Sequence, residues 1–197
     1  MSKDILFLHM GGTIDSEYNS IAETSKVLKR SIIENFIKKN INPYSNISYK
    51  TVVMKDSREL SAADLDNMVT IIERTPHHRI IITHGTYTIS ETARYIHRNL
   101  KRKNVTVILT GAMTPLLGFA ESDAGFNLGF AMAKVEDLKP GVYVAFNAHI
   151  FMANDISKSL ITTEGRFTSL KSAPKKKIAK KATTTKTTAK SLKANKD

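Results

Sequence analysis

The sequence predicts an α/β fold with a doubly wound, mainly parallel sheet, Rossmann-like or flavodoxin-like, and with helices on both faces. Short apolar runs alternate with segments of helical periodicity, which is typical of a parallel sheet with right-handed crossovers. Three of these runs end in a glycine with small or hydroxyl-bearing neighbours, at 6–15 (LFLHMGGTID), 81–89 (IITHGTYTI) and 107–115 (VILTGAMTP). Strands that open into such loops form the ligand crevice of open α/β sheets, so we expect the three junctions to converge.

The strands of this sheet are predicted from short apolar runs bounded by polar or turn residues. They are expected at residues 4–9, 47–54, 79–83, 105–109 and 142–146. After the first of them, Gly11 and Gly12 allow a tight turn from which Thr13 projects.

The helices are predicted from apolar residues at helical spacing. They are expected at 24–39 with Thr24 or Ser25 as the cap, 61–74 with a Ser61/Asp64 capping box, 90–100 burying Ala93, Ile96 and in part Tyr95, and 123–135. Residues 15–23 are polar and without periodicity, so we expect a mobile loop there, and residues 40–46 with Pro43 form another loop. The mixed segment 149–170 receives no assignment.

Charge divides the chain into a domain at 1–170 and a basic tail at 171–197. The formal net charge is +12, of which the tail carries +9 from ten lysines and one aspartate. The tail has too little apolar content to fold, so we expect it to be disordered. Such lysine runs bind RNA or DNA weakly and without specificity, and a solvated solubility tail is the alternative interpretation.

Several functional classes find no support in the sequence. There is no cysteine, no HxH or HExxH spacing and no nucleotide-binding GxGxxG or Walker motif, so neither a metal nor a cofactor is expected. The N-terminus lacks the pattern of a signal peptide, and no apolar segment reaches the roughly 20 residues of a membrane span. We therefore expect a cytoplasmic protein without a membrane segment.

Hydroxyl groups are the candidate chemical groups of this fold. The four side chains that the junctions can bring to one rim are those of Thr13, Ser57, Thr86 and Lys158. A threonine becomes an effective nucleophile when a base takes its proton and N–H donors stabilise, by hydrogen bonds, the oxyanion that forms on attack. Lys158 could be that base if burial lowers its pKa, and the backbone N–H groups of Gly12 or Gly85 could be the donors.

Several separated motifs occur in the order in which one enzyme family has them. They are GGTI at 11–14, KDSREL at 55–60, THGTYTISETA at 83–93, LTGAMTP at 109–115, SDAGFN at 122–127, GVYVAFNAHIF at 141–151 and EGRF at 164–167. Over about residues 3–168 the chain resembles the threonine-dependent L-asparaginases. The resemblance implies hydrolysis of the side-chain amide of L-asparagine, or of a related amide, to an acid and ammonia.

The resemblance also assigns roles to individual residues. Thr13 matches the nucleophile, Tyr18 a tyrosine that helps to activate it, and Thr86 and Lys158 two members of a proton-transferring triad. The residues that match the substrate-binding positions are Asp56, Ser57, Arg58, Gly85 and Tyr87. Most family members carry a second, C-terminal domain, whereas the resemblance here covers only the first, so we expect a short, single-domain branch. Because family members assemble as dimers or tetramers, we also expect a homodimer or homotetramer.

The chain departs from the family pattern at three positions. Tyr87 stands where the family has an aspartate that binds the α-amino group of the substrate and completes a Thr–Lys–Asp arrangement. Arg58 replaces a glutamine or small residue, and Met10 a threonine. Retention of Thr13, Thr86 and Lys158 favours an amidohydrolase, whereas Tyr87 favours an impaired relative that binds a small amide or amino acid. Both interpretations remain open at the level of the sequence.

Overall fold

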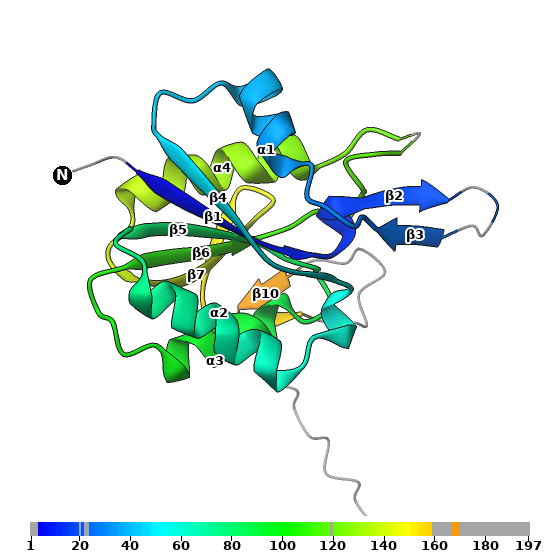
Figure 1. The fold of residues 1–197 in the computed structure, drawn as a ribbon. Helices are drawn as coiled ribbons and strands as arrows, with labels where there is room; N and C mark the ends of the chain where they lie inside the picture. The colour runs from blue at the N-terminus through cyan, green and yellow to red at the C-terminus, as the bar shows by residue number, and fades with distance from the viewer. Residues whose placement is uncertain (1–3, 20, 22–23, 119, 159–166, 170–197) are drawn as a thin grey trace, which may run out of the picture.

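The computed structural model describes residues 4–19, 21, 24–118, 120–158 and 167–169, and it is built around one twisted sheet (Figure 1). The strands of this sheet are β1 (Ile5–Gly11), β4 (Ile47–Lys55), β5 (Arg79–Thr83), β6 (Thr106–Thr110), β7 (Gly141–Phe146) and β8 (His149–Met152). Their order is β4-β1-β5-β6-β7-β8, and all neighbours are parallel except the last pair. The prediction of a mainly parallel α/β sheet is confirmed.

The strand order places a topological switch point beside β1. The chain leaves β1, adds β4 on one side of it, and then adds β5 on the other side. The five parallel strands thus have the flavodoxin-like order 2-1-3-4-5, in which ligands bind outside the carboxyl ends of the strands where the order reverses. The fold therefore directs attention to the turns that follow β1 and β5.

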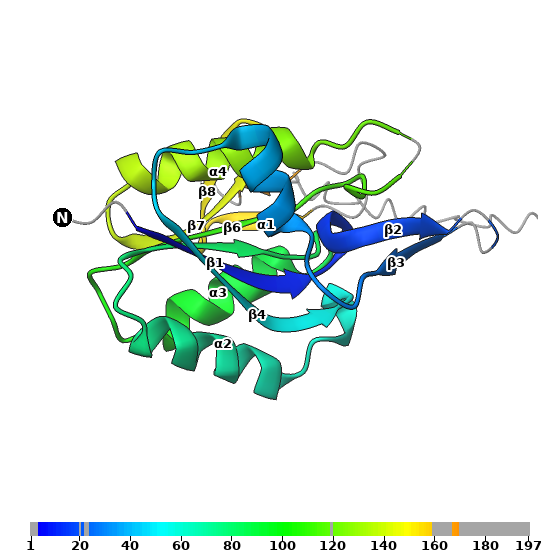
Figure 2. The ribbon, with the colours of Figure 1, turned by 45° about the horizontal axis from the view of Figure 1, so that its top comes forward.

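Helices cover both faces of the sheet (Figures 1 and 2). The helices α2 (Ala62–Arg74) and α3 (Ile89–Asn99) lie on one face, and α1 (Ile33–Phe36) and α4 (Ala124–Asp137) on the other. Successive residues of β1 separate accordingly, since Leu8 packs with the core under α2 and α3 whereas Phe7 packs with the core under α1 and α4. Because both faces are covered, the central strands are buried and mostly apolar, as parallel strands are.

Helix α2 begins as the sequence predicts. The Ser61 hydroxyl accepts a hydrogen bond from the N–H of Asp64, and the Asp64 carboxylate accepts one from the N–H of Ser61, which completes the capping box. This helix ends at Arg74, as expected.

The predictions for residues 15–39 were wrong. In place of a mobile loop and a helix from Thr24, the chain forms two antiparallel strands, β2 (Ser16–Asn19) and β3 (Thr24–Val27). The helix begins only at Ile33, and it continues beyond α1 as a π-helical segment (Ile37–Ile41). The cause is a contact distant in sequence: Asp15 accepts hydrogen bonds from the Ser31 hydroxyl and the Ile32 N–H, both at 3.0 Å.

The segment that received no assignment contributes strands. Besides β8, it contains β9 (Ile156–Lys158) and β10 (Phe167–Ser169), which pair with each other in antiparallel fashion. The predicted basic tail and the domain boundary at 170 lie outside the described residues. None of the helices among the described residues has the length and hydropathy of a membrane-spanning segment.

Candidate active site

The turns after β1 and β5 touch each other through glycines. The backbone of Gly12 has φ +80°, and a Cβ atom built on it would lie 2.3 Å from both Cα and N of Gly85. Real side chains do not approach so closely, so only glycine fits at Gly12. The neighbouring Gly11, with φ +83°, would bring a Cβ to 2.6 Å from the backbone N of Lys55 at the end of β4.

The turn after β6 joins the same cluster. A Cβ on Gly111 would lie 2.4 Å from the carbonyl oxygen of His84 and 3.5 Å from Cγ2 of Thr86. The three glycine junctions predicted from the sequence therefore converge at the carboxyl edge of the sheet, and that prediction is confirmed.

Two of the predicted catalytic residues follow the touching glycines directly. Thr13 comes after Gly12 and starts a short 3₁₀ helix (Thr13–Asp15), where its side chain is half-buried. Thr86 comes after Gly85 and is only 3% exposed, beside Gly111. Both threonines thus lie one residue beyond the point where the turns after β1 and β5 touch.

The other two predicted catalytic residues are placed less fully. Tyr18 lies on β2, and its N–H donates a 3.1 Å hydrogen bond to the carbonyl of Leu117, so β2 is attached to the loop after β6. Lys158 is the last residue of β9. Its side chain lies outside the described part of the structure, so its role stays a prediction.

One expected oxyanion donor is already engaged. The N–H of Gly12 donates a 2.9 Å hydrogen bond to the carbonyl of Lys55, so of the two alternative donors, Gly12 and Gly85, the first is not available to an oxyanion. The cause is the irregular register of β1 against β4 after His9, which brings the end of β4 against the first turn. The Gly85 N–H makes no backbone hydrogen bond within the described residues, so it remains the candidate donor.

Ser57 belongs to the same cluster. It starts a 3₁₀ helix (Ser57–Glu59) after β4, and a Cβ on Gly85 would lie 2.7 Å from its Oγ. Its hydroxyl is buried and has no hydrogen-bond partner within the described residues. The carbonyl of Ser57 accepts a 2.8 Å hydrogen bond from the Thr88 hydroxyl, so the loops after β4 and β5 are held together.

The remaining substrate-binding candidates form a contact that the sequence did not reveal. The Arg58 guanidinium lies over the ring of Tyr87, with Cζ 4.4 Å from the ring centroid. Its Nε and Nη2 donate to the two carboxylate oxygens of Asp56 at 3.0 and 2.8 Å. Hydrogen bonding to Arg58 is the main cause that lowers the pKa of Asp56, so this carboxylate is ionised at neutral pH.

Sequence reasoning missed a buried carboxylate next to Thr13. Asp15 is fully buried, and its Oδ2 has no hydrogen-bond partner within the described residues. Burial raises its pKa to about 6, although the hydrogen bonds from Ile32 and Ser31 act in the opposite direction. Through these bonds Asp15 anchors the turn of Thr13 to the start of α1. No local pattern in the sequence predicts that Asp15 anchors this turn.

Two polar residues of the SDAGFN motif hold the turn after β6. Asp123 accepts hydrogen bonds from the N–H groups of Met113 and Thr114. The buried Asn127 donates to the Gly111 carbonyl at 3.0 Å and accepts from the Asn147 N–H at 2.9 Å. The motif therefore has a positioning function in the structure.

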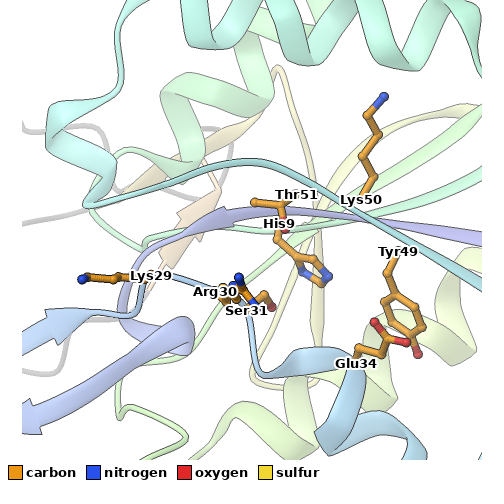
Figure 3. Close-up of a pocket in the computed structure, with 8 residues that line it drawn as sticks. All are labelled: His9, Lys29, Arg30, Ser31, Glu34, Tyr49, Lys50 and Thr51. Carbon is orange, nitrogen blue, oxygen red and sulfur yellow. The ribbon is translucent and has the colours of Figure 1, made fainter.

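A cavity of about 380 Å³ lies apart from the glycine cluster, between β1, β4 and the start of α1 (Figure 3). Its lining includes the buried His9, whose ring stacks on Tyr49 at a centroid distance of 6.0 Å and whose Nδ1 lies 3.2 Å from the Thr83 hydroxyl. Burial lowers the pKa of His9 to about 4. Three basic side chains and one carboxylate also line the cavity: Lys29, Arg30, Lys50 and Glu34. The side chains of Lys50 and Lys29 point away from these two rings in Figure 3.

His84 is also neutral. Burial lowers its pKa to about 4, and its Nδ1 lies 2.8 Å from the Gly85 carbonyl, which can only accept a hydrogen bond. The proton therefore resides on Nδ1. In the described part of the chain, no group of three or more histidine and acidic side chains is arranged to hold a metal ion.

Comparison with known proteins connects this geometry to one family. The family model described as the N-terminal part of asparaginase matches residues 4–191. L-asparaginase 2 of Escherichia coli K12 is 28% identical over 182 residues, which are 87% of this chain and 51% of that protein. L-asparaginase of Thermococcus kodakarensis is 37% identical over 79 residues, which are 40% of this chain and 24% of that protein.

Solved structures agree with the sequence matches. The structure of a probable cytoplasmic L-asparaginase from Campylobacter jejuni has a TM-score of 0.74 and 28% identity, over 86% of this chain and 53% of that one. The thermostable L-asparaginase of Thermococcus kodakarensis has a TM-score of 0.73 and 26% identity, over 84% of this chain and 51% of that one. The chain thus spans about half or less of the length of these relatives.

Proposed function

Because the chain belongs to the asparaginase family, we propose that it is an amidohydrolase that converts L-asparagine or a related amide to an acid and ammonia. The observation that carries the proposal is the contact of Gly12 with Gly85. This contact brings Thr13 and Thr86 to the switch point of the sheet, where open α/β proteins bind their ligands. The names of the related asparaginases support the same chemistry.

The proposed reaction uses Thr13 as the nucleophile. Its Oγ bonds to the amide carbon, the carbon–nitrogen bond breaks, and the protonated nitrogen leaves as ammonia. Water then attacks the resulting ester and releases the acid and free Thr13. In this scheme Tyr18 helps to activate Thr13, and Thr86 with Lys158 transfers protons. The Gly85 N–H is the candidate donor to the oxyanion.

The test is ammonia release by the full chain from a panel of L-asparagine, D-asparagine, L-glutamine and simple aliphatic amides. We expect turnover of at least one amide, and its loss in Thr13→Ala. Circular dichroism and thermal unfolding of Thr13→Ala establish that the variant is folded. The proposal fails if the panel gives no ammonia, or if the variant releases it as fast as the natural protein.

A second candidate is an impaired relative that binds a small amide or amino acid without turnover. It is favoured by Tyr87, an uncharged side chain that is engaged with Arg58. Replacing Tyr87 with aspartate separates the two candidates. A rise in ammonia release from near zero supports an impaired site, whereas loss of an existing activity supports an enzyme with an altered substrate.

Assembly and location are further parts of the proposal. We expect a homodimer or homotetramer, which light scattering coupled to gel filtration tests. A cytoplasmic location is supported by the similarity to the probable cytoplasmic L-asparaginase of Campylobacter jejuni. The basic tail is expected to give weak, salt-sensitive retention on a polyanion column, and unchanged retention after deletion of residues 171–197 contradicts this.

A further inference from the structure

The pair of Arg58 and Tyr87 is an exposed, oriented group on the loops of the candidate site. The Arg58 side chain is 61% exposed, and Tyr87 is 49% exposed. One face of the guanidinium lies on the Tyr87 ring, and its edge is held by both oxygens of Asp56. A further hydrogen bond, from the Arg58 N–H to Asp56 at 2.9 Å, fixes the backbone of the same turn.

The pair lies next to the proposed chemistry along both chain segments. Arg58 follows Ser57, whose side chain packs against Gly85, and Tyr87 follows Thr86. The hydrogen bond from the Thr88 hydroxyl to the Ser57 carbonyl connects these segments directly. Arg58 and Tyr87 therefore each come one residue after a residue of the candidate site. A substrate whose amide is presented to the threonines lies beside this pair.

The charges of this pair decide which substrate group fits. The carboxylate of Asp56 is already bound by two guanidinium nitrogens, so it is not free to take a substrate ammonium group. The third guanidinium nitrogen, Nη1, makes no hydrogen bond within the described residues. A guanidinium nitrogen has no acceptor to offer an ammonium group, whereas a carboxylate would meet a charged donor that is already oriented.

We propose that the Arg58–Tyr87 pair is a specificity determinant, which selects ω-amides of carboxylic acids that carry no α-ammonium group. The substrate of this class that has the carbon skeleton of asparagine is succinamate, the monoamide of a four-carbon dicarboxylic acid. It has the amide and the carboxylate of asparagine without the amino group. The inference rests on the proposed amidohydrolase function, and it names the substrate class of the same site.

The experiment compares ammonia release from succinamate and from L-asparagine by the full chain. We expect kcat/KM for succinamate to exceed that for L-asparagine by about tenfold or more. In Arg58→Gln we expect KM for succinamate to rise by about tenfold, while kcat changes by less than about threefold, because a binding contact is removed. The double variant Arg58→Gln/Tyr87→Asp is expected to prefer L-asparagine.

Two controls separate recognition from folding and from charge in general. Tyr87→Phe keeps the ring under the guanidinium, so it is expected to retain the preference for succinamate. Arg98→Gln removes one positive charge from the exposed last turn of α3, which runs back toward the opposite edge of the sheet. We expect this variant to behave like the natural protein. An equal or higher kcat/KM for L-asparagine in the natural protein overturns the inference.

The failure of the inference can be distinguished from the failure of the proposed function. If neither of these two amides releases ammonia, the recognition is tested by calorimetric titration of the full chain with succinamate and with L-asparagine. The proposed function fails only if the other amides of the panel release no ammonia either. Tighter binding of succinamate that is lost in Arg58→Gln supports the inference. Equal binding, tighter binding of L-asparagine, or no binding of either overturns it.

Discussion

Gly12 and Gly85 touch backbone to backbone: a Cβ atom built on Gly12 would lie 2.3 Å from the Cα of Gly85. This contact joins the ends of two adjacent parallel strands, β1 and β5, at the switch point of the sheet. The residues that follow the two glycines are Thr13 and Thr86, so the contact sets the relative position of the two proposed catalytic hydroxyls. Substitutions around it should therefore affect both stability and catalysis.

The close packing at Gly85 predicts a loss of stability on adding one methyl group. In Gly85→Ala the new Cβ would lie 2.7 Å from both Cβ and Oγ of Ser57. We expect the free energy of unfolding to fall by about 1–3 kcal/mol, as for overpacked cores. Adding Ser57→Gly removes both of the clashing atoms and should restore part of the loss. Urea unfolding followed by circular dichroism measures each value.

The matched control for this prediction is Gly129→Ala. Gly129 lies inside α4, and a Cβ built there has no atom within 4 Å. We expect this variant to gain up to about 1 kcal/mol, because alanine is a better helix former than glycine. A Gly85→Ala variant as stable as Gly129→Ala contradicts the packing argument.

The buried hydroxyl of Thr86 predicts an effect on catalysis. Thr86→Val keeps the shape of the side chain and removes the hydroxyl that is proposed to transfer a proton. We expect kcat to fall by about 100-fold or more, the usual size of a lost acid–base group. Steady-state ammonia release on the best amide of the panel measures it. Thr70→Val, an exposed change on α2, is the control and should leave kcat unchanged.

The buried histidines predict that acid destabilises the fold. Burial lowers the pKa of His9 and of His84 from 6.5 to about 4. The stability from their neutral forms is present above pH 6.5 and is lost as the pH falls toward 4, roughly 3 kcal/mol for each. Asp15 has the opposite effect on stability, because its pKa is raised from 3.8 to about 6. The stability that its protonated form contributes is lost as the pH rises through this range.

Summing these contributions gives the expected pH profile. The free energy of unfolding should fall by roughly 3 kcal/mol between pH 7 and pH 4, since two histidines outweigh one carboxylate. Asp15→Asn removes the opposing contribution, so its decline should be steeper by roughly 2 kcal/mol. Urea titrations at half-unit pH intervals test both statements. A flat profile, or an Asp15→Asn profile parallel to that of the natural protein, contradicts them.

Local features of the sequence determined most of the sheet and the outline of the site. The strand at 79–83, the capping box of Ser61 with Asp64, and the helix ending at Arg74 follow from periodicity and capping, which act within a few residues. The convergence of the three glycine junctions also followed, because parallel strands present their carboxyl ends at one edge. The roles of Thr13, Thr86 and Lys158 come from the family resemblance and stay predictions.

Tertiary contacts decided the rest, because their partners are far apart in the sequence. The sequence from Thr24 has a helical pattern but forms a strand of a hairpin. Asp15 accepts hydrogen bonds from Ser31 and Ile32, and these bonds fix the helix start at Ile33. The Gly12 N–H is bound by Lys55 through an irregular register between β1 and β4.

The contact between Arg58 and Tyr87 is the clearest case at the site itself. The sequence shows two unusual residues 29 positions apart, and periodicity says nothing about their distance. The fold brings the turns after β4 and β5 together through Ser57 and Gly85, and only then does the guanidinium meet the ring. The sequence therefore shows which residues are present, whereas the packing of separate strands brings these two side chains into contact.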